Sequence, residues 1–119
     1  MAIAEIVVKL GGEIVGKPTL DSIARDLQQL IGEGRRLVVT HGGGPQATAL
    51  AQRLGQVPKI VAGRRVTDEG TLEIMKMTVA DQVNVDLCAR LRANGLRPIG
   101  LHDVVRATRR PARKISGAA

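Results

Sequence analysis

The first half of the chain alternates short apolar runs with longer stretches in which apolar side chains recur every three or four positions. The run IAEIVVKL at 3–10 ends in β-branched residues and stops at Gly11-Gly12, which predicts a buried strand followed by a glycine turn. Helical spacing over 18–31 predicts the first helix, because a Pro-Thr pair opens it and two glycines follow its end.

A second strand and a second helix follow in the same order. LVVT at 37–40 is a short β-branched run and predicts another buried strand. Apolar positions at helical spacing over 45–54 predict a helix that ends before Gly55.

The third predicted helix is much longer than the first two. It covers 68–94, with Thr67 as the expected cap in front and Asn94-Gly95 as the stop signal behind. LRPIGL at 96–101 then predicts a further strand.

Short strands that alternate with helices favour right-handed β-α-β crossovers and a parallel sheet covered by helices on both faces. The predicted fold class is therefore α/β, with a mainly parallel sheet in a three-layer α-β-α sandwich. A length of 119 residues fits one domain over 1–119, and a chain of that length buries roughly two thirds of its unfolded surface.

The end of the chain has a different character, because arginines replace the apolar pattern. We interpret 103–119 as a basic hairpin or tail, in which two β-prone pieces at 104–107 and 113–115 pair.

Composition narrows the choice of partners. Eighteen Lys and Arg against eleven Asp and Glu give a net charge of +7, which favours an anionic partner. The chain has no Phe, Tyr or Trp, so it lacks the aromatic side chains that stack on nucleic-acid bases. Nucleic-acid binding is therefore expected only nonspecifically. The single Cys88 and the lack of a long apolar segment favour a cytoplasmic protein without a membrane span.

Glycine clusters follow both predicted strands. Gly11-Gly12 comes after the first strand and 42–44 after the second, and ligands of open parallel sheets bind at the carboxyl ends of strands. Glycine lets backbone N–H groups approach an anion closely, and the second cluster opens a helix whose N-terminus favours negative charge. A phosphate or carboxylate is the ligand this indicates, although either cluster alone is also typical of a tight turn. Neither cluster matches the dinucleotide fingerprint or the P-loop.

Two basic positions lie near these clusters in the sequence. Lys9 ends an apolar strand, where a buried ammonium group is costly unless it meets an anion, and snorkelling to the surface is the alternative. Arg64-Arg65 precedes the start of the long helix, and an arginine there could hold a carboxylate with two hydrogen bonds or simply be solvated.

Four motifs in order resemble the N-terminal half of the acetylglutamate kinases, which belong to the amino-acid kinase family. They are VVKLGG at 7–12, HGGGPQ at 41–46, GRRVTDEGTLEIMKM at 63–77 and NVDLCARLRANGLRPIGLH at 84–102. The resemblance covers nearly the whole chain and implies the N-terminal half of the amino-acid kinase fold.

The resemblance also implies a role for each candidate site residue. Lys9 matches the lysine that stabilises the transferring phosphoryl group, and Arg65 matches the arginine that clamps the substrate carboxylate. Gly11 and Gly12 match the backbone cradle for the ATP phosphates. Gly43 and Gly44 match the glycines that bind the substrate. No metal ligand is expected from this chain.

Full-length acetylglutamate kinases are more than twice as long and hold the nucleotide-binding half, where ATP binds with Mg²⁺. This chain alone is expected to bind neither. The expected partners are N-acetyl-L-glutamate and a second copy of the chain, which would form a homodimer through helix 68–94. The dimer is expected because this helix has more apolar surface than one core contact requires. One face is formed by Leu72, Met75, Val79, Val83, Leu87 and Leu91, and further apolar surface is added by Ile74, Met77, Ala80, Val85 and Cys88. The alternative is a monomer in which the second face packs under the second helix or the hairpin.

Two classes of function follow. In the first, the chain supplies the substrate-binding and dimerisation half of an enzyme that phosphorylates the γ-carboxylate of N-acetyl-L-glutamate with ATP in arginine biosynthesis, and it is inactive alone. In the second, it is an isolated or engineered α/β module with idle kinase motifs, whose basic tail binds polyanions nonspecifically.

Overall fold

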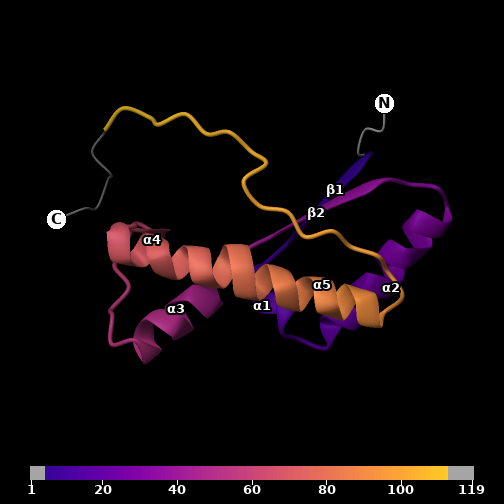
Figure 1. Ribbon diagram of the computed structural model, residues 1–119, viewed down its shortest axis with the longest axis horizontal. Helices are drawn as coiled ribbons and strands as arrows, with labels where there is room; N and C mark the ends of the chain where they lie inside the picture. The colour runs from indigo at the N-terminus through magenta and orange to yellow at the C-terminus, as the bar shows by residue number, and fades with distance from the viewer. Residues whose placement is uncertain (1–4, 113–119) are drawn as a thin grey trace.

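The computed structural model describes residues 5–112 (Figure 1). Two strands, β1 (Ile6–Leu10) and β2 (Leu37–His41), form a parallel pair in which Ile6 lies opposite Leu37 and Leu10 opposite His41. Helix α2 (Thr19–Gly32) connects them. The α/β fold class, the parallel sheet and the first predicted helix are therefore confirmed.

The main core lies between one face of this sheet and two helices. Val8, Leu37 and Val39 pack against buried side chains of α2 and of α5 (Asn84–Ala93). The other sheet face is open, because Val7 and Val38 are 66% and 46% exposed. In residues 5–112, helices therefore cover one face of the sheet and not the second face that a three-layer sandwich would also cover. The buried members of this core are Leu10, Val15, Leu20, Ala24, Leu27, Val83, Leu87, Leu91 and Leu96.

The long helix is continuous, but its middle third is wound differently from its ends. Helix α4 (Glu69–Met75) runs into a π-helical segment, η1 (Lys76–Val83), and then into α5. The buried Thr78 hydroxyl donates to the carbonyl oxygen of Ile74 at 2.6 Å, a side-chain bond that competes with the regular helical ladder. Sequence periodicity predicted the length of this helix but not its π-helical segment.

The predicted cap was wrong at the start of the long helix and correct at its end. Thr67 was wrong as the N-terminal cap, because Asp68 has extended backbone and its carboxylate accepts the Thr71 N–H at 2.8 Å. The same hydrogen bond lowers the pKa of Asp68. At the other end Asn94 is the cap and Gly95 has φ +86°, which confirms the predicted stop.

Much of the apolar face predicted to be free on the long helix is occupied within the chain. Val83, Leu87 and Leu91 are buried in the main core, and Met75 packs on a smaller cluster with α3 (Gly44–Arg53). The apolar side chains that this helix leaves exposed are Leu72, which belongs to that face, and Met77 and Val85, which lie outside it.

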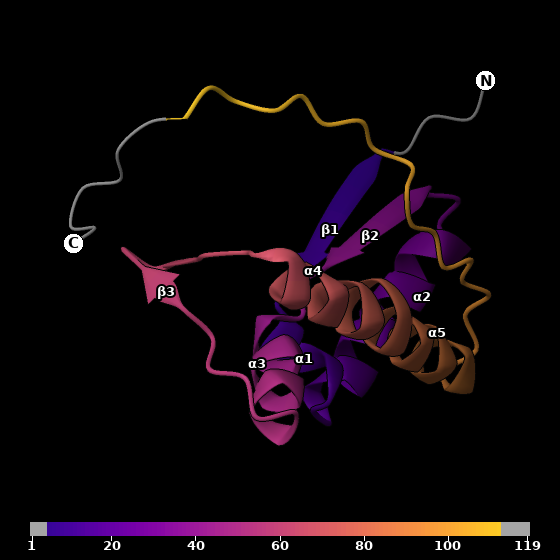
Figure 2. The ribbon, with the colours of Figure 1, turned by 60° about the vertical axis from the view of Figure 1, so that its left-hand side comes forward.

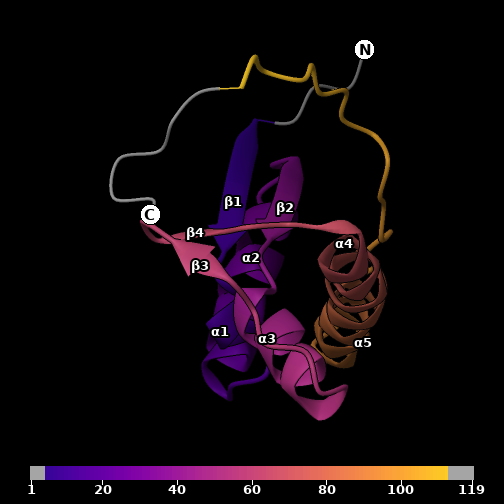
Figure 3. The same cartoon turned by 90° about the vertical axis from the view of Figure 1, so that its left-hand side faces the viewer.

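Two short elements were not predicted from the sequence. Helix α1 (Gly12–Val15) follows β1 directly, and β3 (Ile60–Val61) pairs with β4 (Arg64–Arg65) as an antiparallel hairpin. Its two turn residues, Ala62 and Gly63, both have positive φ, at 49° and 73°, as the type I′ turn of a two-residue hairpin requires. The hairpin projects away from the helices (Figures 2 and 3).

The strand predicted at 96–101 was wrong. The segment is not paired with any described strand and runs back along α5, where the Pro98 carbonyl accepts from Arg92 Nη2 at 3.2 Å. Pro98 lacks the N–H that a ladder needs, and Gly100 lies close to the Asn84 and Cys88 side chains. Residues 104–107 are not a strand either, and their predicted partner, 113–115, lies outside the described residues.

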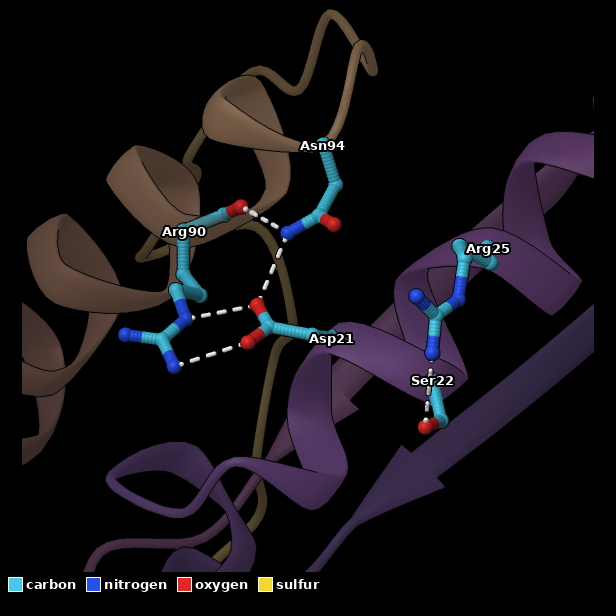
Figure 4. A network of polar contacts seen from close by, with 5 residues as sticks. All are labelled: Asp21, Ser22, Arg25, Arg90 and Asn94. Atoms are coloured by element: carbon cyan, nitrogen blue, oxygen red, sulfur yellow. Dashed lines mark hydrogen bonds and ion pairs between the residues drawn. The ribbon is translucent and has the colours of Figure 1, made fainter.

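A polar contact joins α2 to the end of the long helix (Figure 4). Arg90 donates from Nε and Nη2 to the two carboxylate oxygens of Asp21, at 2.7 and 3.0 Å, and Asn94 Nδ2 donates to Oδ1 at 2.9 Å. The bonds from Arg90 and then Asn94 hold the pKa of Asp21 below its usual value, and Asp21 raises the pKa of Arg90. The pair is exposed, so it orients the two helices more than it stabilises them.

Candidate functional site

The glycine loops meet because the two strands end side by side. Leu10 and His41 are opposite one another in the register, and the Gly42 N–H donates to the Leu10 carbonyl oxygen at 2.9 Å. Loop 11–12 and loop 42–44 therefore leave the sheet at the same end, where both strands have their carboxyl ends, as the sequence predicted.

The contact between the loops is so close that glycine is required at two positions. A Cβ at Gly12 would lie 2.6 Å from the Gly43 nitrogen, and a Cβ at Gly43 would lie 2.7 Å from Cγ2 of Val79 on η1. At Gly44 a Cβ would meet nothing within 4 Å. Gly12 and Gly43 thus serve the packing of the protein itself, and Gly44 is the one with open space for a ligand.

Backbone N–H donors lie at this end of the sheet. Gly44 begins α3, where the first N–H groups of a helix have no carbonyl partner within it. Pro45 has no N–H and the Ala47 N–H donates to Gly43, so the N–H groups left to bind an anion are those of Gly44 and Gln46. At Gly11 the space that a Cβ would take is filled by the carboxylate of Glu13, the acidic residue in the first turn of α1. A phosphate bound at Gly11 would have to displace that carboxylate.

One side chain connects the two loops. Gln46, in the first turn of α3, donates from Nε2 to the Gly12 carbonyl oxygen at 2.6 Å. Its Oε1 is buried and has no hydrogen-bond partner among the described residues. The amide therefore binds the first loop from the helix that carries the second.

Arg65 reaches the same helix from the β3–β4 hairpin. Its Nη2 donates to Thr48 Oγ1 at 2.7 Å and to the Gly44 carbonyl oxygen at 3.2 Å. Both Nη2 hydrogens are then used, and the donors on Nε and Nη1 remain for a ligand. Arg64, by contrast, is exposed. Of the arginine pair, Arg65 is the one that lies beside the second glycine loop.

Lys9 lies on the open face of the sheet. It is opposite Thr40 in the register, shares its face with Val7, and is exposed. It makes no hydrogen bond or ion pair with residues 5–112, so its charge is not neutralised there. Its position two residues before Gly11 keeps it near the strand end, but the structure does not bring it into contact with the glycine loops.

Sequence reasoning missed Gln46, Thr48 and Val79, which contact the predicted site residues. Gln46 ends the motif HGGGPQ and Thr48 lies in the polar run GPQAT, whereas Val79 was recognised only as part of the apolar face of the long helix. An apolar groove of about 780 Å³ lies between β2, the long helix and residues 97–105, and none of the predicted site residues line it.

A comparison with protein families decides the relationship. The profile described as amino acid kinase family matches residues 4–115. The chain belongs to this family. In the part that the structure describes, no helix is long and apolar enough to cross a membrane, and no three His, Cys, Asp or Glu side chains gather where they could hold a metal ion.

Curated relatives within the family confirm the resemblance to acetylglutamate kinases. An acetylglutamate kinase of Anaeromyxobacter dehalogenans (strain 2CP-C) is 61% identical over 117 residues, which cover 95% of this chain and 43% of the relative. The acetylglutamate kinase of Sorangium cellulosum is 50% identical over 121 residues, covering 98% of this chain and 43% of that protein. The chain thus spans less than half the length of these relatives.

Solved structures of an N-acetylglutamate synthase are also similar to this chain, at lower identity. A crystal structure of N-acetylglutamate synthase from Neisseria gonorrhoeae with coenzyme A and N-acetyl-glutamate has a TM-score of 0.62 and 31% identity, covering 82% of this chain and 25% of that chain. The same enzyme with coenzyme A and L-arginine has a TM-score of 0.58 and 30% identity, covering 86% and 22%.

Proposed function

We propose that this chain provides the N-acetyl-L-glutamate-binding part of an acetylglutamate kinase. The observation that carries the proposal is the position of Arg65, whose guanidinium lies beside Gly44 at the start of α3. Free N–H donors and the fixed guanidinium of Arg65, together at the start of α3, suit a carboxylate ligand. The names of the relatives and of the synthase structure, which holds N-acetyl-glutamate, support this substrate. The cytoplasmic location and the place in arginine biosynthesis belong to the same proposal.

In the proposed reaction a γ-carboxylate oxygen of N-acetyl-L-glutamate attacks the γ-phosphorus of ATP. A new O–P bond forms, the bond to the bridging oxygen of ADP breaks, and the products are an acyl phosphate and ADP. Such a transfer needs aligned reactants and positive charge near the transferred oxygens. Arg65 and the N–H of Gly44 would hold the acceptor, and the unneutralised charge of Lys9 would stabilise the transferred group.

ATP with Mg²⁺ supplies the phosphoryl group in this proposal. The backbone N–H groups of Gly11 and Gly12 suit a phosphate, but the Glu13 carboxylate at Gly11 does not, so Glu13 must move for them to serve. Because the chain spans 43% of the length of its relatives, the complete activity would need residues beyond these.

The proposal includes a homodimer through the long helix. It no longer rests on the full apolar face predicted from the sequence, because the core uses most of it. It rests on Leu72, Met77 and Val85, which are 49%, 49% and 60% exposed on this one helix.

Isothermal titration with N-acetyl-L-glutamate tests the substrate assignment. The chain should bind this ligand, Arg65→Lys should weaken binding because it removes the planar donor pair, and Arg64→Lys should not. Equal loss in both variants, or loss only in Arg64→Lys, would contradict the role of Arg65.

A DNA duplex titrated at two salt concentrations separates this function from nonspecific polyanion binding. Binding to phosphate backbones falls steeply with salt. No binding of N-acetyl-L-glutamate, together with salt-sensitive binding of DNA, would favour the basic structural module instead.

A further inference from the structure

Very few hydrogen bonds fix the position of the two glycine loops relative to each other, although α1 and α3 also pack against one another. Strand pairing brings them together up to Leu10 and His41, and one backbone hydrogen bond, from Gly42 N–H to Leu10, extends the register by one step. Beyond that point, a single side-chain hydrogen bond between the loops' elements is found in residues 5–112, from Gln46 to the Gly12 carbonyl.

The backbone contact beneath Gln46 resists compression but not separation. A Cβ at Gly12 would overlap the Gly43 nitrogen and Cα at 2.6 and 2.8 Å, so the loops cannot move closer. Nothing in that contact prevents them from moving apart. The Gln46 hydrogen bond, at 2.6 Å and linking residues 34 positions apart in the sequence, opposes this movement.

We infer that Gln46 is a positioning residue that sets the separation between loop 11–12 and loop 42–44. The identity of the ligands rests on the proposed function, in which the first loop cradles the phosphoryl donor and the second binds the acceptor. In-line transfer then depends on the distance between the loops, because misplacement of reacting groups by about 1 Å can cost a hundredfold in rate.

The chemistry of the amide makes this inference testable. Glutamine donates to the Gly12 carbonyl at every pH, whereas a glutamate at 46 can donate only while it is protonated. A glutamate side chain has a pKa of about 4.3 in water, and donation to a carbonyl favours its neutral form and raises the pKa. Methionine at 46 keeps the length and approximate volume of the side chain but has no donor.

The experiment compares Gln46→Met and Gln46→Glu with matched changes at Gln52, an exposed glutamine on the same helix. Circular dichroism first checks that each variant is folded. Amide exchange of Gly42, whose N–H donates to the Leu10 carbonyl oxygen at the end of β1, should be about 3- to 10-fold faster in Gln46→Met, the factor expected for one neutral hydrogen bond. Gln52→Met should leave it unchanged.

The glutamate variant adds a pH profile that a purely structural role would not produce. In Gln46→Glu the NMR amide signals of Gly12 and Gly43 should shift with a midpoint above pH 4.3, the value for free glutamate, as the bridge breaks. In Gln52→Glu and in the unchanged chain they should not. Unchanged Gly42 exchange in Gln46→Met, or no titration in Gln46→Glu, would overturn the inference.

Titration of the same samples with N-acetyl-L-glutamate separates this inference from the proposed function. Gln46→Met should weaken binding about 3- to 10-fold. If the unchanged chain does not bind the ligand, the proposed substrate is wrong, and the exchange and pH results still decide whether Gln46 sets the loop separation. If the chain binds it and Gln46→Met binds it equally well while Gly42 exchange is faster, Gln46 is only a structural tether and the positioning role is refuted.

Discussion

The contact between Gly43 and Val79 predicts a specific pattern of stability changes. In Gly43→Ala the new methyl would lie 2.7 Å from Cγ2 of Val79 and 3.3 Å from its Cβ, well inside ordinary contact distance. Overpacking of this kind costs about 1–3 kcal/mol of the free energy of unfolding. The loop or η1 must shift to relieve it.

Val79→Ala should remove the obstacle. Alone, it deletes two methyl groups from a half-buried side chain and costs about 1 kcal/mol, since a fully buried CH₂ contributes about 0.8 kcal/mol. In the double variant the methyl at 43 occupies part of the vacated space. The two changes should therefore cost less together than their sum, by about 1–2 kcal/mol, within the range for residues in contact.

Urea unfolding measures all four proteins of this cycle, followed by far-UV circular dichroism because the chain has no Phe, Tyr or Trp. Gly44→Ala is the control, since its Cβ would meet nothing within 4 Å. It should be neutral or stabilise by about 0.4–1 kcal/mol through the unfolded chain. Additive costs in the double variant, or a loss in Gly44→Ala as large as in Gly43→Ala, would refute the packing argument.

Four further predictions concern activity, binding, pH and assembly. The chain alone should release no ADP from ATP and N-acetyl-L-glutamate in a coupled assay, and turnover that disappears in Lys9→Ala would contradict this. Thr48→Val should weaken N-acetyl-L-glutamate binding about tenfold by titration, because Arg65 loses its short hydrogen bond; Thr48→Ser should retain affinity, and equal affinity of the two variants would count against the contact. The lowered pKa of Asp21 gives stability that is present above its ordinary pKa of 3.8 and lost as pH falls through the lower folded value, so the urea midpoint should fall less between pH 5 and 3 in Asp21→Asn than in the unchanged chain; identical profiles would show that the group contributes nothing. Light scattering should find a dimer that Val85→Glu disrupts and that Val57→Glu, at a 92% exposed position off the helix, does not, and a monomeric mass for the unchanged chain would exclude the dimer.

Local patterns in the sequence predicted the regular elements well. The helix expected over 18–31 is α2, Thr19–Gly32, and the strands expected at 3–10 and 37–40 contain or match β1 and β2. In each case apolar periodicity and a glycine stop agreed, so local preference and burial selected the same structure.

Predictions failed where a longer-range contact or a single side chain decided the outcome. Residues 96–101 have the composition of a strand, but in the structure they lie along α5 without a strand partner. The π-helical turn at Lys76–Val83 does not alter the apolar pattern enough to be recognised, and the Thr78 bond within it is not visible in the sequence.

In the candidate site, too, the sequence predicted some features and missed others. Parallel strands that both end in glycines predicted that loops 11–12 and 42–44 meet, because strand topology alone requires it. Strand topology does not determine how closely the two loops approach, so it does not predict that Gly12 and Gly43 touch. The hydrogen bond from Gln46 to Gly12 joins residues 34 positions apart. Neither is encoded in any local pattern.

The two-stranded sheet also bears on how molecules of this protein behave toward each other. In residues 5–112, β1 and β2 pair only with one another, so each has an outer edge whose backbone groups are not used by a further strand. Such edges are templates for intermolecular strand addition, and the open face with Val7 and Val38 adds apolar surface beside them. A net charge of +7 keeps like molecules apart at low ionic strength, and salt near 1 M shortens the screening length to about 3 Å. The colloidal stability of the protein should therefore be lowest in concentrated salt, where repulsion no longer protects the sheet edges.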